Sequence, residues 1–139
     1  MTEVYDSLKI EVIPGDSRYV RLLEQFRFYS DTVSSFCFIP RGFVFDLESV
    51  PVIRGTNPEA GAIHDYFCRI DSYPVVDKET AAKIYFEFQA FYDRQESGNW
   101  FNRIWDWIRR RVKTRVVEVA PDYFHKFSVM ATYEELRAG

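Results

Sequence analysis

The chain has 139 residues, 47% of them hydrophobic and 18% aromatic, which is enough to bury the core of one domain spanning residues 1–139. The formal net charge of −3 excludes a general attraction to nucleic acid, and no apolar run approaches the roughly 20 residues of a membrane span. The N-terminus has no basic start followed by an apolar core, and the two cysteines lack zinc-site spacing, so we expect synthesis and folding in a reducing cytoplasm.

Residues 1–51 are predicted to be mainly β. Residues 8–13 alternate apolar and polar side chains before Pro14 and Gly15, which predicts a strand that ends in a turn. Residues 19–29 fit helical and strand spacings, but frequent aromatic and β-branched residues without a helix cap favour strands. Short strands are also predicted at 34–39 and 43–45. We therefore expect a small antiparallel sheet.

Residues 57–113 are predicted to be helical. Asn57 before Pro58 is a typical helix start, and apolar residues at spacings of three and four continue to about residue 70. A second helix is expected from Asp77 or Thr80 to a break at residue 97, and Asn99 caps a third that runs to about residue 112. Residues 114–139 are expected to contain a strand at 116–119 and a tail. A sheet followed by three helices packed together makes the fold class α+β.

The first predicted helix contains the main candidate for chemistry, His64 followed by Asp65. A neutral imidazole could take a proton from water, and the next carboxylate, about 100° round the helix, could bind a cation or orient a substrate. Adjacent helical residues do not touch, so the pair forms no relay. A hydrolytic site would also need an acid that fixes the imidazole tautomer and a group that stabilises the oxyanion. Taken alone, a helical histidine is more often a structural group.

Three segments form a more specific pattern: Ile39-Pro40-Arg41-Gly42-Phe43-Val44-Phe45-Asp46 with Ser49-Val50-Pro51, then Ile63-His64-Asp65, then Ala81-Ala82-Lys83-Ile84-Tyr85. Over roughly residues 8–112 they resemble an uncharacterised domain family of tailed bacteriophages and prophages. Its members read Gly-Phe-x-x-Asp-x-x-Ser-Val-Pro, followed by His-Asp. The resemblance implies a phage protein that is made in the host cytoplasm and located in the virion.

The His-Asp motif is also similar, more weakly, to the catalytic helix of secreted and parvoviral phospholipases A2. In those enzymes the histidine is the general base, the next aspartate binds calcium, and a tyrosine and a second aspartate hold the histidine. Carried over, His64 would be the base and Asp65 the calcium ligand. Cys68 stands where the tyrosine belongs and Ala82 where the second aspartate belongs, so neither supporting group is present.

Two other carboxylates could replace the missing acid. Glu79 lies one helical turn before Ala82 on the same face, and Asp46 lies where the predicted sheet meets a loop. The candidate catalytic residues are therefore His64, Asp65 and Glu79, and the candidate ligands of Ca²⁺, the one cofactor considered, are Asp65 and Asp46. Residues 54–57 contain one glycine, in place of the glycine-rich calcium loop of the phospholipases. We interpret the site as a degenerate hydrolase site.

The third predicted helix is rich in tryptophan and arginine. It could be a core-packing helix with a solvated basic edge, which is the plainest interpretation, an interfacial membrane helix or a phosphate-binding face. Docking against an acidic neighbouring subunit is a further alternative. The residues of this candidate interface are Trp100, Trp105, Trp107, Arg109, Arg110 and Arg111.

The sequence favours binding over catalysis. The surplus of aromatic residues, the Trp/Arg helix and the incomplete surroundings of His64 predict a virion-associated tail, baseplate or assembly protein that binds other phage structural proteins. Oligomeric or multi-copy assembly fits that role. The alternative is an active calcium-dependent accessory hydrolase that attacks a phospholipid or a cell-envelope bond, with His64 activating water.

Overall fold

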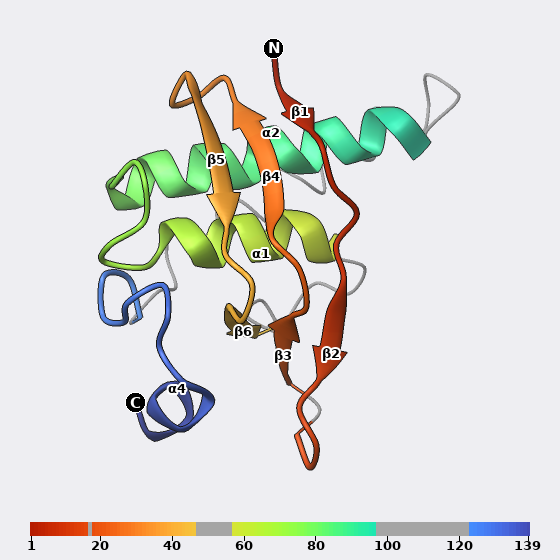
Figure 1. Ribbon diagram of the computed structural model, residues 1–139. Helices are drawn as coiled ribbons and strands as arrows, with labels where there is room; N and C mark the ends of the chain where they lie inside the picture. Colours follow the sequence, from red (N-terminus) through yellow and green to blue (C-terminus); the bar gives the residue numbers. More distant parts are fainter. Residues whose placement is uncertain (17, 47–56, 97–122) are drawn as a thin grey trace.

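The computed structural model describes residues 1–16, 18–46, 57–96 and 123–139, and it shows six strands followed by helices (Figure 1). The α+β class is therefore confirmed. The predicted strands at 8–13, 19–29, 34–39 and 43–45 are all present, and a short N-terminal strand was not predicted. The strands are β1 (Glu3–Val4), β2 (Ile10–Val12), β3 (Tyr19–Leu22), β4 (Phe26–Ser30), β5 (Ser35–Ile39) and β6 (Val44–Asp46).

The strands form two antiparallel sheets of three strands each, where the sequence suggested a single sheet. The first sheet has the order β1-β4-β5 and the second has the order β2-β3-β6. Gly42 has a φ of +90°, a conformation that glycine adopts readily, and it turns the chain out of the first sheet after β5. The Gly42 amide donates to Leu22 O at 2.8 Å, so β6 begins beside β3 in the second sheet.

Three helices lie within the described residues: α1 (Pro58–Phe67), α2 (Lys78–Glu96) and α4 (Tyr133–Ala138). The predicted starts of the first two are confirmed, because Asn57 caps α1 by accepting from Ala60 N at 3.0 Å and the Asp77 carboxylate accepts from Thr80 N at 2.7 Å. Helix α1 ends three residues before the expected position, and α4 was not predicted. The helix expected at 99–112 and the strand expected at 116–119 lie outside the described residues.

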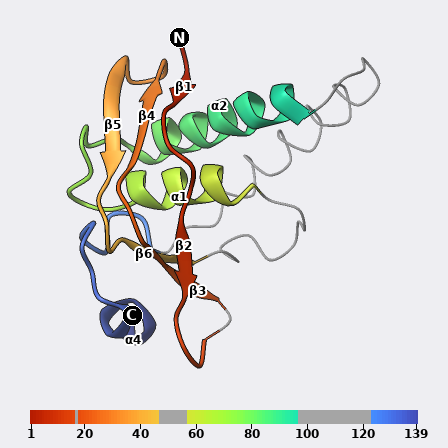
Figure 2. The same ribbon diagram turned by 45° about the vertical axis from the view of Figure 1, so that its right-hand side comes forward.

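The main core lies between the first sheet and helices α1 and α2, which cover one face of that sheet in both views (Figures 1 and 2). Phe28 of β4 is fully buried and stands between two other rings. Its centroid is 6.0 Å from that of Phe67 in α1 and 5.2 Å from that of Phe88 in α2, both in edge-to-face contact. The aromatic residues of the two predicted helices therefore do build the core.

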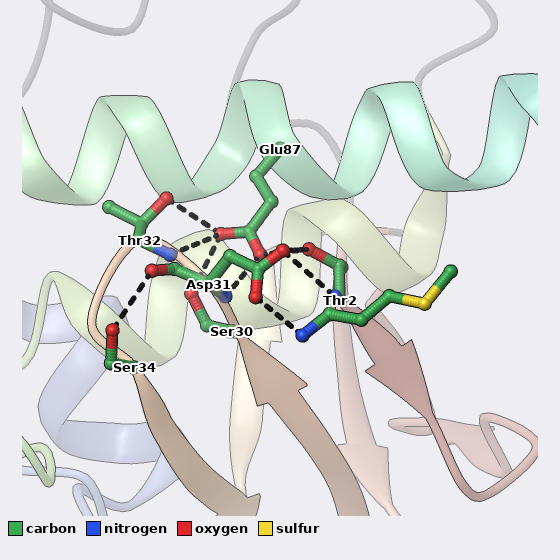
Figure 3. A network of polar contacts seen from close by, with 7 residues as sticks. Thr2, Ser30, Asp31, Thr32, Ser34 and Glu87 are labelled. Carbon is green, nitrogen blue, oxygen red and sulfur yellow. Dashed lines mark hydrogen bonds and ion pairs between the residues drawn. The ribbon is translucent and has the colours of Figure 1, made fainter.

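A polar cluster joins α2 to the turn between β4 and β5 (Figure 3). The Glu87 carboxylate accepts from the hydroxyls of Ser30 and Thr32 at 2.7 Å and from the amide of Asp31 at 2.8 Å. The Thr2 hydroxyl also donates to Glu87, and the Thr2 amide donates to Asp31 at 3.0 Å. One carboxylate on a helix thus fixes the end of β4 and the residue before β1.

The C-terminal residues pack on the second sheet. Leu136 of α4 and Ala131 before it join a second buried cluster with Ile13 and Val44. Thr132 caps α4 by accepting from Glu135 N at 3.2 Å. None of the described helices combines the length and the hydrophobicity that a membrane span requires.

Candidate functional site

His64 faces the inside of the molecule from the second half of α1. The residue is only 3% exposed, and its ring packs edge-on against Tyr85 of α2 with the centroids 5.3 Å apart. The Cys68 sulfur, one helical turn later, lies 3.5 Å from Nε2 and 3.7 Å from Nδ1. The imidazole is therefore part of the contact between the two long helices and has little access to water.

The residues at the positions expected to support the imidazole provide no acid that could orient it for catalysis. Burial raises the pKa of the Cys68 thiol, and the nearby Asp65 carboxylate raises it further, so the sulfur stays a neutral weak donor at neutral pH. Glu79 is exposed in the first turn of α2, and its carboxylate makes no hydrogen bond or ion pair with any described residue. Ala82 is fully buried and has no polar atom beyond its backbone. No carboxylate among the described residues lies within hydrogen-bond distance of the ring.

Asp65 is the more unusual of the two adjacent residues because its carboxylate is buried, with the residue 5% exposed. Its Oδ2 accepts from the Asp46 amide at 3.3 Å. Its Oδ1 lies 3.9 Å from His64 Nδ1, which is too far for a hydrogen bond, and has no hydrogen-bond partner among the described residues. A buried carboxylate oxygen without a donor is a position that a cation could occupy.

Asp46 and Asp65 do come together, as expected, but through the backbone of Asp46. The Asp46 side chain, at the end of β6, forms an ion pair of 2.8 Å with Arg18. The part of the chain that the structure describes contains no group of three or more His, Cys, Asp or Glu residues that could hold a metal. Ca²⁺ takes six to eight oxygen ligands, so these two carboxylates would be a fraction of its coordination shell.

Sequence reasoning missed Arg69, which stands four residues after Asp65, just past the end of α1. Its buried guanidinium donates to Val44 O at 2.8 Å and to Ser128 O at 3.0 Å, and its central carbon lies 4.7 Å from the centroid of Phe43. Burial lowers the pKa of Arg69, and the Asp65 carboxylate opposes that shift. Arg69 therefore links the end of α1 to β6 and to the C-terminal segment. The i, i+4 spacing of an acid and a base was the signal that could have revealed it.

Residues 123–131 cover the end of α1 that carries these groups. The His125 amide donates to Cys68 O at 2.8 Å, and the Ile70 amide donates to Phe127 O at 2.9 Å. Burial raises the pKa of the Tyr123 hydroxyl, and the proximity of Asp65 raises it further. The C-terminal segment thus closes the surroundings of His64 and Asp65 by backbone hydrogen bonds.

A family model described as a protein of unknown function, DUF1353, matches residues 20–105, which is more than half of the chain. The chain belongs to the DUF1353 family. No curated protein and no solved structure matches it. Membership of an uncharacterised domain family is thus confirmed, whereas a phage origin stays a prediction. The match to DUF1353 includes His64, Asp65 and Arg69 and ends before the C-terminal segment that covers them.

A second candidate surface of this DUF1353 protein is the outer face of the first sheet, which points away from the helices (Figure 2). Phe36 and Phe38 of β5 are 69% and 53% exposed. The Phe36 ring stacks on Tyr5 with centroids 6.0 Å apart and meets Tyr29 edge-on at 5.0 Å. A shallow hollow beside these rings is lined by the residues Tyr5, Gln25, Arg27, Phe28, Phe36, Cys37 and Phe38.

The sequence carried a signal for this surface, because residues 36–39 are apolar at every position. A strand turns alternate side chains to opposite faces, so half of such a run must point away from the core when only one face is covered. The interface predicted from the Trp/Arg helix, residues 100–111, lies outside the described residues.

Proposed function

We propose that this protein is a virion-associated tail, baseplate or assembly component of a bacteriophage that acts by binding other phage proteins. The observation that carries the binding role is the exposed aromatic outer face of the first sheet. Contiguous exposed aromatic groups are enriched at protein interfaces and unusual on surfaces that face only water. The assignment to a phage particle rests on the motif resemblance in the sequence.

The surroundings of His64 support binding over turnover. A general base must reach the proton it removes, within about 2.6–3.2 Å or through one water. His64 is buried against Tyr85 and Cys68, and the C-terminal segment covers the adjacent end of α1. Its position fits a degenerate site that now joins α1, α2 and the C-terminal segment.

The test is recovery of partners from cells in which the encoding phage is assembling. The tagged chain should co-purify with phage structural proteins, and mass spectrometry should detect the untagged chain in purified particles. The double variant Phe36→Ser/Phe38→Ser should lose these partners. Val12→Ser removes another exposed apolar side chain, on the second sheet, and should keep them. Absence of the chain from particles together with an unchanged set of partners in the double variant would refute the proposal.

The second candidate function is a calcium-dependent hydrolase that acts on a phospholipid or a cell-envelope bond. The observation that favours it is the buried Asp65 Oδ1, which has no donor among the described residues. A bound Ca²⁺ would raise the thermal unfolding temperature of the protein, and the isosteric variant Asp65→Asn would abolish that rise. The binding proposal predicts no calcium-dependent shift in either protein, so one titration separates the two functions.

A further inference from the structure

Strand β5 is at the edge of the first sheet, with β4 on one side and no described strand on the other (Figure 1). The hydrogen bonds of the neighbouring strand β4 show in which direction the backbone groups of β5 point. The Tyr5 amide donates to Arg27 O at 3.0 Å, so the backbone of Arg27 faces away from β5. Successive residues of a strand alternate, so Phe28 faces β5 and exchanges hydrogen bonds with its register partner Cys37.

The two neighbours of Cys37 therefore turn their amides and carbonyls toward the free edge. These neighbours are Phe36 and Phe38, whose side chains are also exposed. The Phe36 carbonyl accepts from the Ser35 hydroxyl at 3.0 Å within the same strand, which leaves its second lone pair open. The backbone groups that pair with no described strand and the exposed rings of β5 thus belong to the same two residues.

Strand β5 also lacks the features that normally prevent an edge from pairing. Each of the other strands at a sheet edge in the described residues contains a carboxylate: Glu3 in β1, Glu11 in β2 and Asp46 in β6. Edge strands are usually protected by charge or proline, but β5 reads Ser-Phe-Cys-Phe-Ile, with neither. A five-residue apolar edge of this kind is suited to accept another strand.

We propose that the partner at this edge is a second copy of this chain, whose β5 pairs antiparallel with the first about a two-fold axis at Cys37. Phe36 of each copy then lies opposite Phe38 of the other as a hydrogen-bonded pair, which satisfies the outward backbone groups of both strands. Aromatic pairs directly opposite each other stabilise antiparallel strands. The two copies form one six-stranded sheet in which the two aromatic outer faces are continuous.

The charges at the ends of β5 favour pairing of the strand with itself in this direction. Arg41 follows β5 and is exposed, and Asp31 precedes it, with its exposed carboxylate 2.7 Å from the N-terminal ammonium of Met1. Antiparallel pairing places the two Arg41 side chains at opposite ends of the paired strands, whereas parallel pairing would bring them together. No charged residue stands within the paired segment Ser35–Ile39, so the two strands meet without repulsion.

The test is the oligomeric state of the purified full chain, measured by sedimentation velocity over a concentration series. The wild-type chain should form a dimer. Phe38→Pro removes an outward amide and no hydrogen bond to β4, and it should weaken the dimer at least about tenfold. Phe38→Thr keeps the amide and should weaken the dimer less.

The control is Val12→Pro, at an outward position of the charged edge β2, which should leave the dimer unchanged. A wild-type chain that stays monomeric at every concentration overturns the proposal, as does a Phe38→Pro variant that dimerises like wild type.

Hydrogen exchange gives a readout that does not need a proline variant to fold. The Phe36 and Phe38 amides should exchange more slowly as the concentration of wild-type chain rises, while the Val12 amide should not change. Equal exchange at all concentrations would contradict the pairing. If Phe38→Pro does not fold, Phe38→Lys places a charge at the same edge and should give the same loss of dimer. No phage protein is present in these measurements, so their failure is distinct from a failure of the proposed function.

Discussion

The covered end of α1 and the outer face of the first sheet distribute polar and apolar groups in opposite ways. At the end of α1 a histidine, a carboxylate and a guanidinium are each at least nine-tenths buried, in His64, Asp65 and Arg69. On the sheet, Phe36 and Phe38 are open to water. General acid–base catalysis needs ionisable groups that can reach the substrate. The buried charges join segments of the chain, and the exposed rings are the basis of the proposed binding role.

The strongest test of the contrast compares two phenylalanines on neighbouring strands. Phe28→Ala should lower the free energy of unfolding by about 4–5 kcal/mol, because the Phe28 ring stands between Phe67 and Phe88 and leaves a cavity. Phe36→Ala should change it by less than about 0.5 kcal/mol, because Phe36 is exposed. Urea unfolding of the two variants measures both values. Similar losses would mean that the outer face is part of the folded core.

The next test concerns the buried charges. Arg69→Met should lower the free energy of unfolding by about 3–4 kcal/mol, because it leaves the carbonyls of Val44 and Ser128 without their charged donor. The matched control is Arg21→Met, which removes an exposed ion pair with Glu11 and should lower it by less than about 1 kcal/mol. Urea unfolding measures both losses of free energy. Equal losses in the two variants would show that Arg69 does not hold these segments together.

A smaller effect is expected at the cluster that anchors the turn before β5. Glu87→Gln should lower the free energy of unfolding by about 1.5–3 kcal/mol, because a neutral amide accepts less strongly from Ser30 and Thr32 and turns a donor toward them. Glu24→Gln affects one exposed ion pair with Lys9 and should change it by less than about 0.5 kcal/mol. Thermal unfolding ranks the two variants, and the reverse ranking would contradict the role of Glu87.

The smallest expected effect is a dependence on pH at the surface. The hydrogen bonds from the Arg27 guanidinium hold the pKa of Asp6 below its ordinary value of 3.8. A carboxyl whose folded pKa is depressed stabilises the fold above the unfolded pKa and loses that contribution as pH falls through the folded pKa. The free energy of unfolding should therefore fall between about pH 5 and pH 3 less steeply in Asp6→Asn than in wild type. An unchanged slope would show that the Arg27 pairing contributes nothing to acid sensitivity.

Local signals predicted most of the fold. The cap at Asn57, the acid at Asp77 and the alternation in residues 8–13 act within a few residues of the element they define, so the sequence shows them directly. Strand β1 has only two residues and depends on pairing with β4 and on the bond from Thr2 to Glu87, 85 residues away. The six residues of α4 are too few to establish a helical period. Elements held by distant partners leave no local pattern.

The sequence predicted which residues belong to the candidate site better than it predicted how deeply they are buried. The sequence motifs identified His64, Asp65 and Asp46 as candidates. In the structure the Asp46 amide donates a hydrogen bond to the Asp65 carboxylate. The burial of these groups was not predictable, because the C-terminal segment attaches through backbone amides and carbonyls, which any residue can supply. Glu79 shares the face of Ala82, but its place in the exposed first turn of α2 removes it from the imidazole.

Residues 123–131 attach to the rest of the molecule through loop hydrogen bonds and through the buried side chains of Val129 and Ala131. The segment adds no strand to either sheet among the described residues, and its links to the body include the Arg69 side chain and short loop hydrogen bonds. Stretches with few such links undock at lower free energy than the rest of a fold. Undocking here would hydrate the imidazole and the carboxylate beside it while the sheets stay intact. In that state the solvent access of the pair would depend on a part of the chain outside the region that the family model matches.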